Sequence, residues 1–161
     1  MTNTAVKPIP DDMRGLVPHL ICSNGSDAID FYKRAFGAVE VSRTLMPNGK
    51  LMNAIMRIGG ASFMLMDENP DWGARGPALL GGTPVSIMFY VEDVDAAFAH
   101  AVEQGATAKM PPADMFWGDR FGALIDPFGH SWSLATHIKD VTPAEAQAAA
   151  NCAPGGASPS Q

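Results

Sequence analysis

The segment Phe116-Trp117-Gly118-Asp119-Arg120 is the sharpest local sign of chemistry in the sequence. Two aromatic rings beside a glycine turn can form a stacking wall for a planar ligand, and Asp119 and Arg120 can contact a polar substituent. The alternative is that Trp117 packs against its own loop and that Asp119 and Arg120 form a weak surface ion pair. We expect at least one of the aromatic residues, Phe116 or Trp117, to line a ligand cavity.

Histidines are the second set of candidates, because imidazole titrates near neutral pH. His19 lies in an apolar strand pattern, and side-chain alternation places it opposite Leu20 and Cys22, towards a cavity. Two roles stay open for it: a hydrogen-bond donor or general base for a ligand, or a core histidine bonded to a backbone carbonyl. For His130 and His137, at the ends of the last predicted strand, we expect structural or solvent-exposed roles.

Ten methionines are many for a chain of 161 residues, and most fall in or beside predicted strands. The alternation directs Met64, Met88 and Tyr90 to the same face as His19. Because the methionine side chain is flexible and polarisable, such a surface adapts to bulky or variable apolar ligands.

A strand–helix–three-strand pattern positions these residues, and it occurs twice. Met88 follows His19 by 69 positions, and Gly129 follows Gly60 by the same interval. The fold class predicted is α+β, with two tandem βαβββ modules that form a cup-shaped mixed sheet with helices on its outer face. The strands are expected at 15–22, 39–46, 51–58, 61–67, 83–91, 106–110, 119–125 and 130–136, and the helices at about 26–36 and 93–104.

The predicted organisation is a single domain at 15–137, with modules at 15–68 and 83–137 joined by a Gly- and Pro-rich linker at 69–82. Residues 1–14 are expected to form a flexible arm. Residues 138–161 are expected to form a short helix, begun by a capping box from Thr142 to Glu145, and then a disordered end.

Composition excludes several classes of function. A net charge of −6 disfavours nucleic-acid binding, and the apolar runs are too short to span a membrane. The first residues show no secretory signal, and Cys22 and Cys152 do not form a disulfide framework. The simplest location is therefore a reducing cytoplasm.

The duplicated pattern, the helices AIDFYKRAFGA and VEDVDAAFAHAVEQGA and the DPFGH turn resemble the vicinal oxygen chelate superfamily over about residues 15–137. That superfamily contains glyoxalase I, extradiol dioxygenases, fosfomycin-resistance enzymes and bleomycin-binding proteins. The stretch from MFWGDR to the last strand is similar to a poorly characterised glyoxalase-like branch. The resemblance implies metal ligands on the first and last strand of each module, at positions that fall on His19, Met64, Met88 and Ser133.

Only His19 of these four is a good ligand for a divalent metal, because thioethers and a neutral hydroxyl are poor partners for such ions. We therefore expect neither a divalent metal nor another cofactor. Whether a soft metal such as copper(I) binds His19 with Met64 and Met88 stays open.

Two functions follow. The first is binding of a small, largely apolar or aromatic molecule in a metal-free cup, with His19, Tyr90, Arg120 and Ser133 setting its orientation. The alternative is an enzyme, either a metal-dependent lyase, isomerase or dioxygenase, or a metal-free acid–base catalyst that uses His19. The resemblance also implies a homodimer, with the cup completed within one chain or across two.

Overall fold

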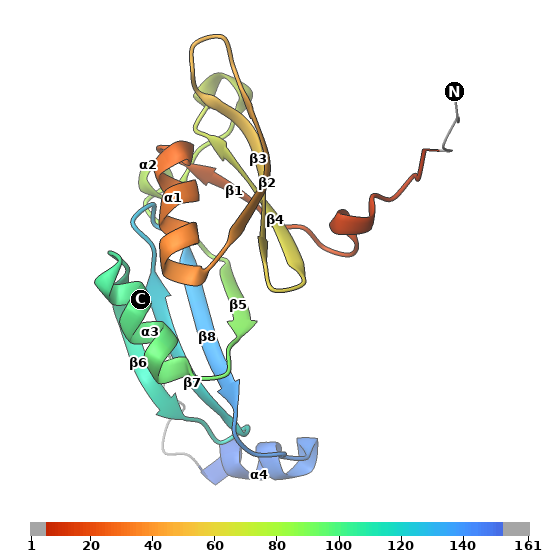
Figure 1. Cartoon of the computed structure of the whole chain (residues 1–161). Coiled ribbons are helices and arrows are strands. Elements are labelled where there is room, and N and C mark those ends of the chain that lie inside the picture. The colour runs from red at the N-terminus through yellow and green to blue at the C-terminus, as the bar shows by residue number, and fades with distance from the viewer. Residues whose placement is uncertain (1–5, 153–161) are drawn as a thin grey trace.

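The computed structural model describes residues 6–152 and contains two successive βαβββ modules (Figure 1). The first consists of β1 (His19–Cys22), α1 (Gly25–Phe36), β2 (Val39–Leu45), β3 (Leu51–Ile58) and β4 (Ala61–Asp67). The second consists of β5 (Ser86–Tyr90), α3 (Val94–Glu103), β6 (Thr107–Asp114), β7 (Asp119–Ile125) and β8 (Ser131–His137). The predicted α+β class with two tandem modules is confirmed.

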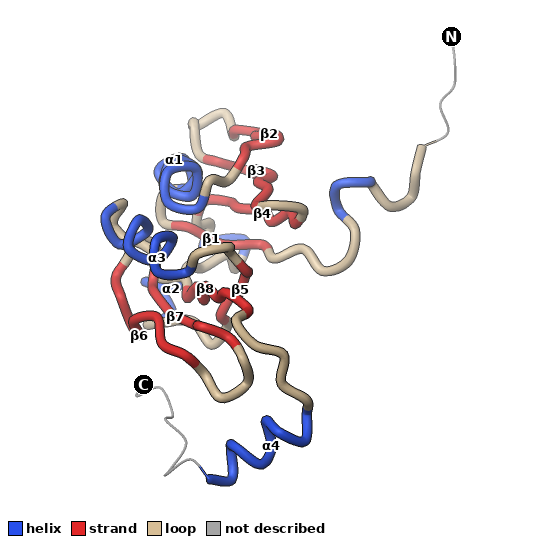
Figure 2. Tube along the Cα trace, turned by 60° about the horizontal axis from the view of Figure 1, so that its bottom comes forward, coloured by secondary structure: helices blue, strands red, loops and turns tan. Residues whose placement is uncertain are grey.

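Each module forms one four-stranded mixed sheet, and the two sheets have the same topology. The strand orders are β1-β4-β3-β2 and β5-β8-β7-β6. The β1–β4 and β5–β8 pairs are parallel and the other pairs are antiparallel. β1 and β5 are edge strands of their sheets. Figure 2 shows that both lie where the two modules meet.

One helix covers one face of each sheet. The side chain of Asn24 accepts a hydrogen bond from the N–H of Asp27 at the start of α1, and Gly37 ends that helix with φ of 63°. Asp93 caps α3 in the same way. The opposite face of the second sheet, here called the open face, carries Met88 and Tyr90, which are 44% and 59% exposed.

Aromatic residues join the two modules into one hydrophobic core. The ring of Trp132 in β8 lies 4.9 Å from that of Phe36 and 5.4 Å from that of Tyr32, both in α1. Phe36 also contacts Phe89 of β5 at 5.4 Å. The core therefore runs continuously from α1 through both sheets.

Asp126, in the turn before β8, adds a polar link inside this core. Its carboxylate is 3% exposed and accepts hydrogen bonds from the hydroxyl of Tyr32 at 2.6 Å and the indole N–H of Trp132 at 2.9 Å. Because Tyr32 belongs to the first module, the bond ties the modules together.

Several predicted boundaries differ from the structure, and the fifth strand, predicted at 83–91, is Ser86–Tyr90. The first strand is shorter than predicted and begins at His19. The sixth strand is longer and runs through Pro111 and Pro112 to Asp114, which is tolerated because β6 is an edge strand. The predicted linker at 69–82 contains the short helices η2 (Pro70–Trp72) and α2 (Pro77–Leu80).

The two ends of the described chain project from the body (Figures 1 and 2). A short helix η1 (Asp11–Met13) interrupts the arm, and Arg57 of β3 forms an ion pair with Asp12. The tail helix α4 (Pro143–Cys152) begins with the predicted Thr142–Glu145 capping box. The expected disorder of the last residues, 153–161, lies outside the described residues. Within 6–152, no helix has the length and apolarity needed to cross a bilayer.

Candidate functional site

A pocket of about 550 Å³ lies at the seam between the modules, and we call it the seam pocket. Its walls come from the segment leading into β1, from the linker with α2, and from the adjoining ends of β5 and β8. The lining residues are Leu16, Val17, Pro18, His19, Leu20, Ile21, Arg75, Pro77, Leu80, Gly82, Thr83, Pro84, Val85, Ser86, Ile87, His130 and Ser131.

His19 is the predicted site residue that the structure places in this pocket. Leu20 and Cys22 on either side of Ile21 are buried against the core, so His19 faces away from the helices. Partial burial disfavours the charged imidazolium and lowers the pKa of His19 below its ordinary value. The side chain is therefore a neutral imidazole at neutral pH, with one ring N–H to donate and one nitrogen to accept.

The four positions that the resemblance implied as metal ligands form two cross-strand pairs. His19 is the register partner of Met64 on β4, and Met88 is the partner of Ser133 on β8. Ser133 is 5% exposed, and its hydroxyl lies 2.9 Å from that of Ser86.

These residues do not fit a divalent metal. One imidazole, two thioethers and a hydroxyl already hydrogen-bonded to another serine lack the carboxylates and additional imidazoles that such ions prefer. Across residues 6–152, no group of three or more His, Cys, Asp and Glu side chains is arranged to hold a metal ion.

A second polar cluster lies at the far end of the open face, centred on Asp119. This carboxylate is 4% exposed and accepts hydrogen bonds from the hydroxyl of Tyr90 at 2.8 Å, the indole N–H of Trp117 at 3.1 Å and Nδ1 of His137 at 2.9 Å. Burial opposes ionisation, but the bonds from His137, Tyr90 and Trp117 outweigh it and hold the pKa of Asp119 below its ordinary value.

His137 lies between two carboxylates. Its Nε2 is 2.9 Å from Asp140, and its Nδ1 is bonded to Asp119. Donation from both nitrogens requires the imidazolium, and the two carboxylates, Asp140 first, raise the pKa of His137. His130, by contrast, is 8% exposed, and its Nε2 lies 2.9 Å from the carbonyl oxygen of Ile21, a structural contact between the modules.

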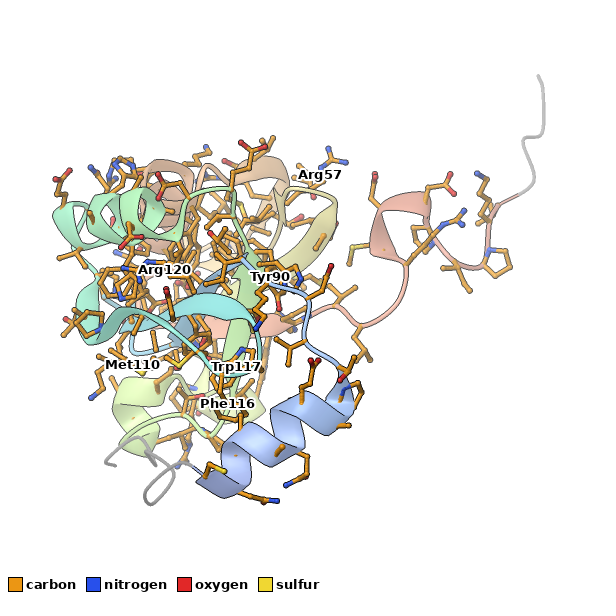
Figure 3. The ribbon with its side chains drawn as sticks, turned by 90° about the horizontal axis from the view of Figure 1, so that it is seen from below. Arg57, Tyr90, Met110, Phe116, Trp117 and Arg120 are labelled. Atoms are coloured by element: carbon orange, nitrogen blue, oxygen red, sulfur yellow. The ribbon has the colours of Figure 1, made fainter. Side chains whose placement is uncertain are left out.

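The ion pair between Asp119 and Arg120, expected from the sequence as the alternative to a ligand contact, does not form. Alternation sends Arg120 to the other face of the sheet, where its guanidinium binds both carboxylate oxygens of Asp95 on α3, at 2.6 and 2.8 Å, and Asp114 at 2.8 Å. Figure 3 shows Arg120 towards α3, away from Phe116 and Trp117. Arg120 therefore holds α3 against β6 and β7 and lies outside the seam pocket.

Phe116 and Trp117 form the β6–β7 turn and also lie outside the lining of the seam pocket. Their rings meet edge to face at 5.0 Å, and they are 46% and 38% exposed. Both lie towards α4 (Figure 3). Met88 and Tyr90 share the open face with the Asp119 cluster, whereas His19 lies in the seam pocket and Arg120 on the helix-covered face, so the predicted site residues do not form one site.

Sequence reasoning missed two features of these places. It did not identify Arg75, which the linker brings into the seam pocket, or Asp119 as a hub for three side chains. The signal for Arg75 was weak, because a Gly- and Pro-rich linker does not reveal which strand it crosses. For Asp119 the available signal was its strand parity, which matches that of His137, its register partner.

Comparisons with known proteins agree with this architecture. An uncharacterised protein of Mycobacterium tuberculosis is 47% identical over 137 residues, which are 83% of this chain and 81% of that protein. The X-ray structure of an Arabidopsis thaliana gene product matches with a TM-score of 0.62 and 29% identity, over 75% of this chain and 97% of that one. The fosfomycin resistance protein FosX of Listeria monocytogenes, complexed with Mn(II) and 1S,2S-dihydroxypropylphosphonic acid, shares the fold at a TM-score of 0.59 and 22% identity, over 83% and 94% of the chains.

A match to the sequence model of a protein family covers most of the chain. The sequence model of one superfamily covers residues 16–134, which include the first module, the second module as far as the middle of β8, and the seam pocket. The chain belongs to the Glyoxalase/Bleomycin resistance protein/Dioxygenase superfamily.

Proposed function

We propose that this protein binds a small, largely apolar or aromatic molecule in the seam pocket and does so without a divalent metal. The observation that carries the proposal is the pocket itself, whose volume of about 550 Å³ falls in the range of small-molecule sites. Its walls are mostly aliphatic, from residues such as Leu16, Ile21 and Val85. Burial of apolar ligand surface against these walls supplies the affinity.

The donor set supports binding without a metal. Each cross-strand pair offers at most one good ligand for a borderline dication, and Ser133 already shares a hydrogen bond with Ser86. The Mn(II) in the FosX structure belongs to a protein with which this chain shares the fold at 22% identity. The absence of a divalent metal is therefore proposed from the residues of this chain.

The test joins elemental analysis with a thermal-shift screen of planar aromatic compounds. Protein purified without chelator is expected to hold far less than one equivalent of any divalent metal. Compounds that bind only the folded protein raise its melting temperature. Ser86→Phe fills the pocket and should abolish these shifts, whereas the matched variant Ser42→Phe, on the distant edge strand β2, should leave them unchanged.

Two results would contradict the proposal. Near-stoichiometric metal that is lost in His19→Ala would show that the site is a metal centre. A screen in which Ser86→Phe responds to ligands as the unmodified protein does would show that binding occurs outside the seam pocket.

We also propose that the protein is a homodimer in which the open face of the second sheet packs against a second copy. Exposed Met88 and Tyr90 leave an apolar surface there that burial would stabilise. Met88→Asp should shift the protein to monomer in sedimentation experiments. Met52→Asp should leave the protein dimeric. Met52 is similarly exposed, but it lies on β3 of the first sheet, and alternation places it on the helix-covered face with Ala54 and Met56. A monomeric unmodified protein would contradict the proposal.

The cytoplasm is the location that we propose, because Cys22 and Cys152 are both free thiols. Fractionation of cells that produce the protein tests it. Recovery from a secreted or membrane fraction would contradict it.

A further inference from the structure

We propose that the seam pocket selects ligands that carry an anionic group, such as a carboxylate, and that Arg75 is the residue that selects them. This inference rests on the proposed function, since it names the class of molecule that the same pocket takes. The net charge of the whole protein, −6, would by itself favour cationic ligands, so the inference rests on the residues of the pocket lining and not on the net charge.

The charged residues of the pocket lining favour an anionic ligand. The lining contains no aspartate or glutamate, and Arg75 is its one permanently charged residue. Among residues 6–152, no carboxylate forms an ion pair or hydrogen bond with Arg75, whereas Arg120 is held by two. Glu68, on the same stretch of chain, directs its carboxylate to the backbone N–H of Gly76 at 3.1 Å. Arg75 is thus a cation available to a ligand.

The serine hydroxyls add a donor. Ser131 donates to Ser86 at 3.4 Å, and Ser86 and Ser133 are 2.9 Å apart. Ser133 is buried, and of the two serines Ser86 is the one that lines the pocket. A hydroxyl can turn its proton to suit its partner, so Ser86 can donate to a ligand while it accepts from Ser131 and Ser133.

His19 completes this set of donors. As a neutral imidazole it offers one N–H without adding charge, so the positive charge of the lining stays with Arg75. Arg75, Ser86 and His19 all contribute donors to a cavity whose walls are mostly aliphatic. A carboxylate is acceptor-only and can receive all three kinds of donor, whereas an ammonium ion would be repelled by the guanidinium of Arg75 and would leave its N–H groups without an acceptor.

The test compares three probes that share one ring system: 2-naphthoate, 2-naphthamide and 2-naphthylmethylammonium. Calorimetry at low salt should show naphthoate binding about tenfold more tightly than the amide, equivalent to about 1.4 kcal/mol, and the ammonium binding most weakly. Because Arg75 is exposed, the preference should shrink as salt is raised.

Arg75→Gln should remove the preference for naphthoate over the amide, so that the two probes bind with similar affinity. Arg34→Gln removes the same charge from the exposed face of α1, outside the pocket lining, and should preserve the preference. Circular dichroism checks that both variants are folded.

The outcomes separate the two proposals. Equal binding of all three probes, or a preference that survives in Arg75→Gln, overturns the role of Arg75 and leaves the binding function standing. Failure of every probe to bind the unmodified protein counts against the pocket as a binding site and overturns both.

Discussion

Replacement of Asp126 should destabilise the whole domain, because this buried carboxylate organises the junction between the modules. It accepts hydrogen bonds from the side chains of Tyr32 and Trp132 and from the backbone N–H groups of Phe128 and His130, the last two at 2.9 Å. Asp126→Ala leaves four donors without their partner in a site that is 3% exposed.

The expected cost can be worked from these bonds. A buried donor left unsatisfied costs about 1–3 kcal/mol, and water entering the space left by the carboxylate recovers part of it. We therefore expect Asp126→Ala to lower the free energy of unfolding by about 4 kcal/mol. Tyr32→Phe removes only the bond between the modules and should cost about 1.5 kcal/mol. Since domains are stable by about 5–15 kcal/mol, the first change threatens folding at 37 °C.

Urea unfolding followed by circular dichroism and tryptophan fluorescence measures both effects. The two signals should change together, because the core is continuous across the modules. Asp30→Asn, at an exposed position on α1, should change stability by less than about 0.5 kcal/mol. A loss below about 1 kcal/mol for Asp126→Ala would refute the role assigned to this carboxylate.

Three further predictions concern other positions. An NMR titration should give His137 a pKa above its ordinary value. Its contacts with the two carboxylates are then complete below that pKa and weaken as the pH rises through it. Asp119→Asn should lower the titration midpoint of His137, and an unchanged midpoint would contradict the contact. Gly118→Ala should lower the free energy of unfolding by about 2 kcal/mol or more. The φ of Gly118 is +100°, and a Cβ there would lie 2.0 Å from the backbone oxygen of Lys139. An unchanged melting temperature would show that the turn adapts. Burial raises the pKa of the Cys22 thiol far above its usual range, so a thiol reagent should label Cys152 at once and Cys22 only after unfolding; rapid labelling of both would contradict the burial.

The architecture could be predicted because each module repeats its own hydrophobic alternation. The strands at 51–58, 61–67 and 119–125 have the predicted bounds, since turn residues stand on both sides of each. The end of β6 was predicted wrongly because two prolines indicate a loop unless it is known that the strand lies at an edge. Strand order, which decides that point, depends on contacts far apart in the sequence.

The candidate site was less accessible from sequence. Alternation with the 69-residue repeat was enough to pair His19 with Met64 and Met88 with Ser133, and the structure has these pairs in register. Whether these residues bind a ligand stays a prediction. The position of Arg75 depends on the path of the linker, which local propensity does not determine. The contacts of Arg120 depend on which face of β7 lies against α3.

Calorimetric titration of 2-naphthoate into protein stripped of metal tests the central claim most directly, because the claim is that the seam pocket binds its ligand without a divalent ion. We predict saturable binding whose affinity is unchanged when Zn²⁺ or Mn²⁺ is added and which is lost in Ser86→Phe. Binding that appears only after one of these metals is restored would contradict the account.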